Sequence, residues 1–384
     1  MKRPLRSWYE FFAGGGMARL GLGSAWECTF ANEISEKKAS AYRAFFGPSP
    51  ELKVEDVAKL ETDDLPGTPD LVWASFPCQD LSLAGNGAGL SGERSGTFRP
   101  FWSLMKEMVA GGRAPQVVVL ENVTGTLTSH KGSDFRSIVN EFADSGYRVG
   151  ALVINASHFL PQSRPRLFVV GLHGCGAISS SLASNTPSEP FHTKSLVRAH
   201  NDLPKGLQQN WVWWTLPTPK GSVPSLASIL DERSPQTVWH SESETSTLLR
   251  MMTAGHRKKV TEALAVGNRI VGTIYKRTRP NRDGVMAQRA EVRFDGVSGC
   301  LRTPVGGSSR QTVIIVDKGS VRTRLLSTRE AARLMGVPDN YPLPTGYNEA
   351  YHLLGDGVAV PVVDWLESNL LGPLVKLERF DQVA

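Results

Sequence analysis

The chain has 384 residues, of which 40% are hydrophobic and 21% are charged, and its formal net charge is +6 at pH 7. This length predicts two or three domains with a large buried core. No run approaches the roughly 18 consecutive apolar residues of a membrane span, and no apolar signal-peptide region follows the N-terminus, so we expect an intracellular protein with no membrane partner.

The four cysteines are widely separated and form no Cys-x-x-Cys pair. This spacing argues against a zinc site and against a disulfide framework, so no bound metal is expected. It leaves open chemistry that uses a single thiol.

The positive charge is concentrated in one part of the chain. Between Arg250 and Arg310 there are 13 lysines and arginines against 4 acidic residues, whereas the remainder is slightly acidic. A basic segment of this kind is typical of a surface that binds nucleic acid, because neutralising phosphates releases condensed counterions. An ordinary solvated surface is the alternative that charge alone leaves open.

The first half of the chain alternates strand-like and helix-like segments. The expected strands are Arg6–Ala13, Trp26–Asn32, Leu71–Ser75, Val117–Leu120, Val149–Asn155 and Leu167–Gly171. The expected helices include one that starts at Met17, and the segments Glu36–Phe46, Phe101–Ala110 and Ser133–Ser145. This alternation predicts an α/β fold with a mostly parallel, doubly wound sheet.

The amino-acid composition of the sequence changes after Gly171. Glycines, a run of three serines at 179–181 and two prolines lead into a region of short mixed segments with scattered tryptophan and arginine. This change predicts a domain boundary. Helical patterns resume at Ser327–Met335 and at Val358–Leu371.

The glycine turn after the first strand favours a nucleotide-like cofactor. Arg19 occupies the place of the third glycine of the dinucleotide pattern, so a pyrophosphate at this helix N-terminus is disfavoured. Glu33, at the end of the second strand, suits ribose hydroxyls, and Asp56 could accept from an adenine amino group. An adenosine without phosphates fits these residues, and S-adenosylmethionine is the obvious candidate. Either acid on its own could equally be an exposed strand-end residue.

Cys78 follows the apolar strand that ends in Ser75-Phe76-Pro77 and precedes a glycine-rich loop, residues 79–96. Strand ends followed by loops are where open α/β sheets place their chemistry. A single Pro-Cys is nevertheless more often a small buried residue than a reactive one. The residues at the other strand ends are needed to distinguish a reactive Cys78 from a buried structural one.

Two further strand ends carry charged groups. Glu121 follows a strongly apolar strand, where a carboxyl group is costly unless it is paired or used, and it could act as a general acid. Arg164 and Arg166 supply guanidinium groups suited to bidentate contact with a carbonyl oxygen, a carboxylate or a phosphate. For each arginine, a surface ion pair is the simpler alternative.

These motifs together resemble those of the DNA cytosine-5 methyltransferases, and the resemblance covers nearly the whole chain outside a variable middle. In the family's order, the matching segments are Glu10–Gly16, Asn32-Glu33, Asp56-Val57, Pro77-Cys78-Gln79, Gly96-Thr97-Phe98, Glu121-Asn122-Val123, Gln162-x-Arg164-x-Arg166, Thr328–Gly336 and Gly355–Pro361. Three positions depart from the family's pattern: Glu10 stands where Asp is common, Met17 replaces a usual glycine, and Asp356-Gly357 replaces the usual Asn with a small partner.

The resemblance implies a Rossmann-like S-adenosylmethionine-dependent fold and a role for each matching residue. Cys78 would be the nucleophile, Glu121 the acid, Arg166 the contact to cytosine O2 and Arg164 a support of the site. The implied cofactor contacts are Phe12, Ala13, Gly14, Gly16, Glu33, Ile34, Asp56, Val57, Pro77, Phe98, Asp356 and Gly357. The target base would be flipped out of the duplex, and the loop 79–96 would close over it.

The resemblance also implies a domain plan and partners. Residues 1–173 would form the catalytic domain, 174–324 an inserted target-recognition domain, and 325–384 a hinge and C-terminal segment that completes the catalytic domain. The expected partner is double-stranded DNA, with Lys258, Lys259, Arg277, Arg279 and Arg302 as candidate contacts. We expect a cytoplasmic, nucleoid-associated monomer that either accompanies a cognate restriction endonuclease or acts as a solitary enzyme.

Two alternatives stand beside this hypothesis. A transfer-RNA methyltransferase on the same catalytic domain is disfavoured by the long basic middle region, because RNA members of the fold have a reduced recognition segment. A non-catalytic DNA-binding relative is disfavoured because Cys78, Glu121 and Arg166 are all present.

Overall fold

The computed structural model describes residues 5–77, 97–233, 237–280, 283–302 and 310–375. The chain divides into two compact units. The first unit comprises Met1–Asn155, Pro165–Lys220 and Gly357–Ala384, and the second comprises Ala156–Arg164 and Gly221–Asp356.

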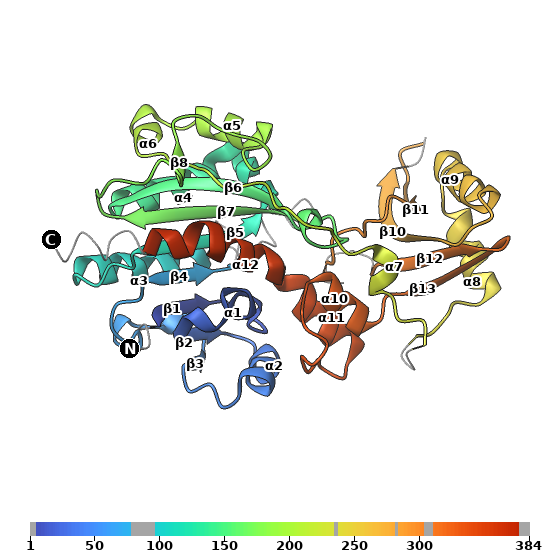
Figure 1. Cartoon of the computed structure of the whole chain (residues 1–384), viewed down its shortest axis with the longest axis horizontal. Helices are drawn as coiled ribbons and strands as arrows, with labels where there is room; N and C mark the ends of the chain where they lie inside the picture. The colour runs from blue at the N-terminus through green and yellow to red at the C-terminus, as the bar shows by residue number, and fades with distance from the viewer. Residues whose placement is uncertain (1–4, 78–96, 234–236, 281–282, 303–309, 376–384) are drawn as a thin grey trace. The chain divides into compact units, whose positions relative to one another are not determined.

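The first unit is built on a seven-stranded sheet with the strand order β3-β2-β1-β4-β5-β7-β6 (Figure 1). Its strands are β1 (Arg6–Phe11), β2 (Trp26–Glu33), β3 (Leu52–Val54), β4 (Leu71–Ala74), β5 (Val117–Val123), β6 (Tyr147–Asn155) and β7 (Pro165–His173). Neighbouring strands from β3 to β5 are parallel, and β7 runs antiparallel to both β5 and β6. The prediction of a mostly parallel sheet is therefore confirmed, and β7 is its reversed strand.

Helices cover both faces of this sheet, which explains why β4 and the first part of β5 are apolar at every position. One face packs on α3 (Phe98–Ala110) and α4 (Ser133–Asp144). The other elements of the unit are α1 (Met17–Leu22), α2 (Glu36–Phe46), α5 (Lys194–Asn201), α6 (Lys205–Gln209), α12 (Val360–Leu366), the short pair β8 (Ala183–Ser184) and β9 (Trp213–Trp214), and short 3₁₀ turns such as η2 (Val57–Lys59) and η6 (Thr124–Leu127).

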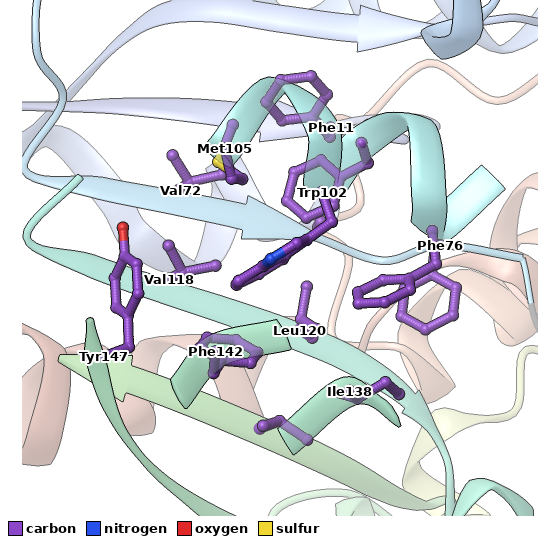
Figure 2. Close-up of a cluster of buried hydrophobic side chains, with 14 of the residues drawn as sticks. Phe11, Val72, Phe76, Trp102, Met105, Val118, Leu120, Ile138, Phe142 and Tyr147 are labelled. Carbon is purple, nitrogen blue, oxygen red and sulfur yellow. The ribbon is translucent and has the colours of Figure 1, made fainter. Parts of the chain in front are cut away.

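Aromatic side chains fill the core between the sheet and α3 and α4. Trp102 of α3 lies with its ring centroid 4.4 Å from that of Phe142 of α4. Figure 2 shows these two rings against Val118 and Leu120 of β5, with Tyr147 of β6 at one side. Because aromatic side chains bury large apolar areas, this cluster holds β4 and β5, which carry two of the predicted catalytic segments, in a rigid setting.

Helix α12 packs against α1 in the first unit. Gly21 approaches Val363 so closely that a Cβ at position 21 would overlap the valine side chain. The longer helical run Tyr347–Val375 has the length and composition of a membrane span, and 56% of its most apolar window is buried. Val362, Val363 and Leu366 are all in the core, so the apolar character of α12 is explained by packing.

The second unit contains a four-stranded antiparallel sheet with the order β11-β10-β12-β13. Its elements are α7 (Leu226–Ile229), α8 (Glu242–Arg250), α9 (Ala254–Ala265), β10 (Ile270–Pro280), β11 (Met286–Arg293), β12 (Thr312–Asp317), β13 (Ser320–Leu325), α10 (Thr328–Leu334) and α11 (Tyr347–Asp356). Residues of α8 and α9 pack with Ile274, Ala290, Val292 and Ile314 in its core. A buried ion pair, in which Arg324 donates to Glu330 at 2.7 Å, joins β13 to α10.

The boundaries of these units differ from the expected domain boundaries at three places. Residues 156–164 belong to the second unit, although the expected catalytic domain includes them. Residues 174–220 belong to the first unit, where Val153 donates to the carbonyl of Phe191 at 2.9 Å. Residues 325–356, with α10 and α11, belong to the second unit. These two units are defined by packing alone. The division into a catalytic domain, a target-recognition domain and a C-terminal segment, with boundaries after residues 173 and 324, stays a prediction.

Candidate active site

The carboxyl ends of β1 to β5 lie along one edge of the sheet, because these strands are parallel. Most of the predicted site residues follow these strands directly. Phe12 to Gly16 follow β1, Glu33 ends β2 and Ile34 follows it, Asp56 and Val57 follow β3, Pro77 follows β4, and Glu121 lies near the end of β5. We call this edge the carboxyl edge.

The glycine turn after β1 is tied to the end of β2 by Glu33. The two oxygens of the Glu33 carboxylate accept hydrogen bonds from the backbone N–H of Gly14 and of Ser35, both at 2.8 Å. Gly14 has φ 57°, and a Cβ added there would meet no described atom within 4 Å. Gly16 has φ 75°, and a Cβ there would overlap the rings of Tyr42 and Phe46. Gly16 is therefore required by packing, whereas the backbone at Gly14 borders open space.

The other predicted cofactor contacts differ in accessibility. The Asp56 side chain accepts from the N–H of Ala58 at 2.9 Å and so begins the turn η2. Ile34 is 66% exposed, which is unusual for a large apolar side chain beside a buried carboxylate. Phe98, at the start of α3, is buried and stacks on Trp102 at a centroid distance of 5.8 Å. Ile34 is thus available to a ligand, while Phe98 is mainly a core residue.

The segment that leads to the predicted nucleophile is fixed from β5. The Asn122 side-chain amide donates to the carbonyl of Phe76 at 3.3 Å, and its Oδ1 accepts from the N–H of Val123 at 2.8 Å. The hydrogen bond from Asn122 to Phe76 joins the Glu-Asn-Val motif to the chain two residues before Cys78. Cys78 itself and the proposed lid, residues 79–96, lie outside the described residues.

Glu121 and Arg166 form an ion pair on adjacent strands. Val123 of β5 is the register partner of Arg166 of β7, so Arg166 and Glu121 are diagonal neighbours on one face of the sheet. Arg166 Nε lies 3.1 Å from Glu121 Oε1, and the side chains are only 15% and 7% exposed. The carboxylate and the guanidinium thus occupy the carboxyl edge together, as a partly desolvated pair.

Arg164 lies in the second unit and is buried at 2% exposure. Its guanidinium donates to the carbonyl oxygens of Leu301 at 2.9 Å and of Gly355 at 2.7 Å. Gln162, in the same motif, accepts from the N–H of Leu301 at 3.0 Å and donates to the carbonyl of Leu334 at 2.6 Å. These contacts fit a residue that supports the backbone, and none of them leaves the second unit.

The last motif is divided between the units. Asp356 ends α11 in the second unit and is exposed, and Gly357 belongs to the first unit. A Cβ on Gly357 would overlap the sulfur of Met17. The departures from the family's pattern at positions 17 and 357 are therefore matched in size. The Met17 side chain occupies the space that Gly357 leaves by having no side chain.

One residue of this region was noted in the sequence only as a departure from the family's pattern. Glu10, the last residue but one of β1, is 2% exposed, and its Oε2 has no hydrogen-bond partner among the described residues. Burial raises the pKa of Glu10 to about 8, and the nearby charge of Arg19 opposes this shift. The signal in the sequence was a single acid inside the aromatic run Trp8-Tyr9-Glu10-Phe11-Phe12.

The candidate DNA contacts all lie in the second unit. Arg277 and Arg279, on the outer part of β10, both approach the Glu291 carboxylate of β11, at 3.3 Å and 3.8 Å. The guanidinium of Arg302 lies 5.7 Å from the centre of the Tyr275 ring. Within the described part of the chain, no group of three His, Cys, Asp or Glu side chains is placed to hold a metal ion.

Comparisons with known proteins agree on one family. The model of the C-5 cytosine-specific DNA methylase family matches residues 7–371. The Type II methyltransferase M1.ScrFI of Lactococcus lactis subsp. cremoris is 26% identical over 96% of this chain and 79% of its own length. The Type II methyltransferase M.HpaII of Haemophilus parainfluenzae is 26% identical over 96% of this chain and 90% of its own.

A solved structure with the same fold is that of the S. pombe Dnmt2 methyltransferase. It has a TM-score of 0.58 and 16% sequence identity, and the match covers 96% of this chain and 99% of that protein. At this identity the likeness concerns the fold alone.

Proposed function

The chain belongs to the C-5 cytosine-specific DNA methylase family, and from this premise we propose that it methylates C5 of a flipped-out cytosine in a specific duplex DNA sequence, with Cys78 as the nucleophile. Enzymes of this family use S-adenosylmethionine as the methyl donor. The observation that carries the proposal for this chain is the Glu121–Arg166 pair at the carboxyl edge, beside the strand that leads into Pro77-Cys78.

The proposed roles follow from the weak nucleophilicity of cytosine C5. The Cys78 thiolate forms a bond to C6, and the electrons of the C5–C6 double bond move toward C5 while Glu121 supports the proton at N3. Arg166 holds the cytosine O2, where negative charge develops. When bound, S-adenosylmethionine would supply an electrophilic methyl group, and transfer of this group to C5 would release S-adenosylhomocysteine. A base then removes the C5 proton, and the S–C6 bond breaks to restore the aromatic ring.

The residues at the ends of β1 and β2 suit the cofactor. The open backbone at Gly14 gives room for a ligand against the turn, and the exposed Ile34 offers an apolar surface for a flat ring. Glu33 already binds two backbone N–H groups, yet each carboxylate oxygen keeps a lone pair that a ribose hydroxyl can use. Glu33 therefore both shapes the turn and contacts the cofactor in this proposal.

Duplex DNA is the proposed substrate, and the second unit is its proposed reader. The basic segment from Arg250 to Arg310 lies in that unit. The relatives M1.ScrFI and M.HpaII are Type II methyltransferases, and we propose that this enzyme likewise serves a restriction-modification system or acts as a solitary methyltransferase. It acts as a monomer in the cytoplasm, on nucleoid DNA.

The test is methyl transfer from labelled S-adenosylmethionine to duplex DNA, with transfer RNA as the competing substrate. We expect label in DNA at one sequence, which bisulfite sequencing of DNA from expressing cells identifies. Equal or greater transfer to transfer RNA would support the RNA alternative. Sequence-specific DNA binding without transfer to either substrate would support the non-catalytic alternative.

A further inference from the structure

A groove on the first unit carries two cations that no predicted role uses. It is lined by Ser188, Glu189, His192, Lys194, Arg198 and Asn201 and has a volume of about 460 Å³. Lys194, Arg198 and Asn201 follow one another along one side of α5, whereas Leu196 anchors the opposite side in the core. Lys194 and Arg198 are exposed and form no ion pair within the described part of the chain.

His192 makes the wall of this groove rigid. Its backbone N–H donates to the carbonyl of Ser188 at 3.1 Å, and its Nδ1 accepts from the N–H of Ser188 at 2.8 Å. Since Nδ1 is an acceptor, the ring proton lies on Nε2, which has no hydrogen-bond partner among the described residues. Burial lowers the pKa of His192 to about 4, so the ring is neutral at physiological pH. The positive charge of the groove therefore comes from α5.

The groove lies at the flank of the carboxyl edge. The carbonyl of Phe191, next to His192, accepts from Val153 near the carboxyl end of β6, and β6 runs parallel to β5 because both are antiparallel to β7. Helix α5 also contacts η6, the turn that follows Glu121-Asn122-Val123 directly. Helix α5, whose exposed side carries Lys194 and Arg198, thus contacts the turn that follows the segment with the proposed acid.

We propose that this groove binds a phosphodiester group of the duplex DNA whose cytosine the enzyme attacks, with Lys194 and Arg198 as the cationic contacts. This inference rests on the proposed function and adds a DNA contact from the first unit. An anion suits the groove because Lys194 and Arg198 outnumber the single carboxylate of Glu189. Contacts to phosphates fix the position of a protein on DNA without reading its sequence.

The test compares DNA binding by three variants, measured by fluorescence anisotropy with a 30-base-pair duplex over a range of salt concentrations. Lys194→Gln with Arg198→Gln should weaken binding by roughly threefold to tenfold at ~0.1 M salt and should reduce the salt slope by about 1. Glu189→Gln should strengthen binding, because it removes the opposing charge. A charge-matched control, Lys37→Gln with Lys106→Gln on α2 and α3, should change binding less than twofold.

Thermal denaturation of each variant establishes that the fold is kept. Equal binding by the double variant and the control would overturn the proposal, as would weaker binding of transfer RNA with duplex DNA unaffected. Displacement of the duplex from wild type by millimolar inorganic phosphate, at constant ionic strength, would instead assign the groove to a free anion. Because binding needs no methyl transfer, these outcomes are separate from a failure of the proposed activity.

Discussion

Arg166 Nε lies 3.1 Å from Glu121 Oε1 in an ion pair across two antiparallel strands, whose register makes the residues diagonal neighbours. The pair is largely shielded from water. Each charge therefore depends on its partner for stabilisation more than a charge in an exposed ion pair does. In the proposed reaction both groups contact the same cytosine. Their contributions to catalysis should therefore be coupled.

We expect Glu121→Gln to lower kcat by about 10²–10⁴-fold, because a general acid contributes on that scale. Arg166→Ala should lower it by roughly 10²–10³-fold. The double variant should lose less than the product of the two single losses, because the residues act as a unit. Arg136→Ala, an exposed arginine on α4, is the control. Strictly multiplicative losses would contradict the coupling.

Asn122 should position the nucleophile segment through the carbonyl of Phe76. We expect Asn122→Ala to lower the free energy of unfolding by about 1–3 kcal/mol, because buried partners lose their hydrogen bonds. It should also lower kcat more than it raises KM for the cofactor. Asn140→Ala, on the exposed side of α4, should change neither quantity. A kcat unchanged by Asn122→Ala would remove the positioning role.

Met17 and Gly357 should behave as a size-matched pair. Gly357→Ala should destabilise the protein by about 1–3 kcal/mol, because its Cβ overlaps the Met17 sulfur. Adding Met17→Ala should recover part of that loss, since the smaller side chain makes room. Urea unfolding of the two single variants and the double variant measures the coupling. If Met17→Ala adds its own cost to that of Gly357→Ala, the pair is not matched.

Glu10 should make stability fall as the pH rises. Its pKa is raised from about 4.5 to about 8, chiefly by burial, so between these values the folded state binds a proton that the unfolded state has lost. Glu10→Gln should flatten the decline and stabilise the protein near pH 9 by on the order of 2–4 kcal/mol. Unfolding curves at pH 5, 7 and 9 measure this. Glu27→Gln, an exposed neighbour on β2, should leave the slope as in wild type.

The sequence predicted those features that depend on local pattern. The ends of α2 and the positions of β1, β4 and β5 follow from short aromatic or apolar runs and from the turn glycines and helical stretches between them. The antiparallel direction of β7 could not be predicted in this way, because an apolar strand has the same pattern in either direction. The strands β10 to β13 were also missed. In β10 and β11 the alternation is broken by charged residues on a partly exposed ribbon. Strand β12 is a short buried apolar run, a pattern that a strand shares with a buried helix segment.

Tertiary contacts decided the rest of the candidate site. Glu33 was predicted as a ribose contact, and no local pattern could indicate that it also binds the N–H of Gly14. The packing of residues 174–220 on the first unit depends on contacts such as Val153 with Phe191, far apart in the chain. Arg164 and Arg166 are two residues apart in one motif, yet the chain passes from one unit to the other between them.

In the proposed mechanism, Cys78 forms a covalent bond to cytosine C6. Once bisulfite sequencing has identified the target, a duplex with 5-fluorocytosine at that position should trap the enzyme, because after methyl transfer no C5 proton remains to be lost. Mass spectrometry of the adduct, formed with S-adenosylmethionine present, should place the nucleoside on Cys78, with Cys28, Cys175 and Cys300 unmodified and no adduct in Cys78→Ser. An adduct on another cysteine, or full methyl transfer by Cys78→Ser, would contradict the proposed role of Cys78.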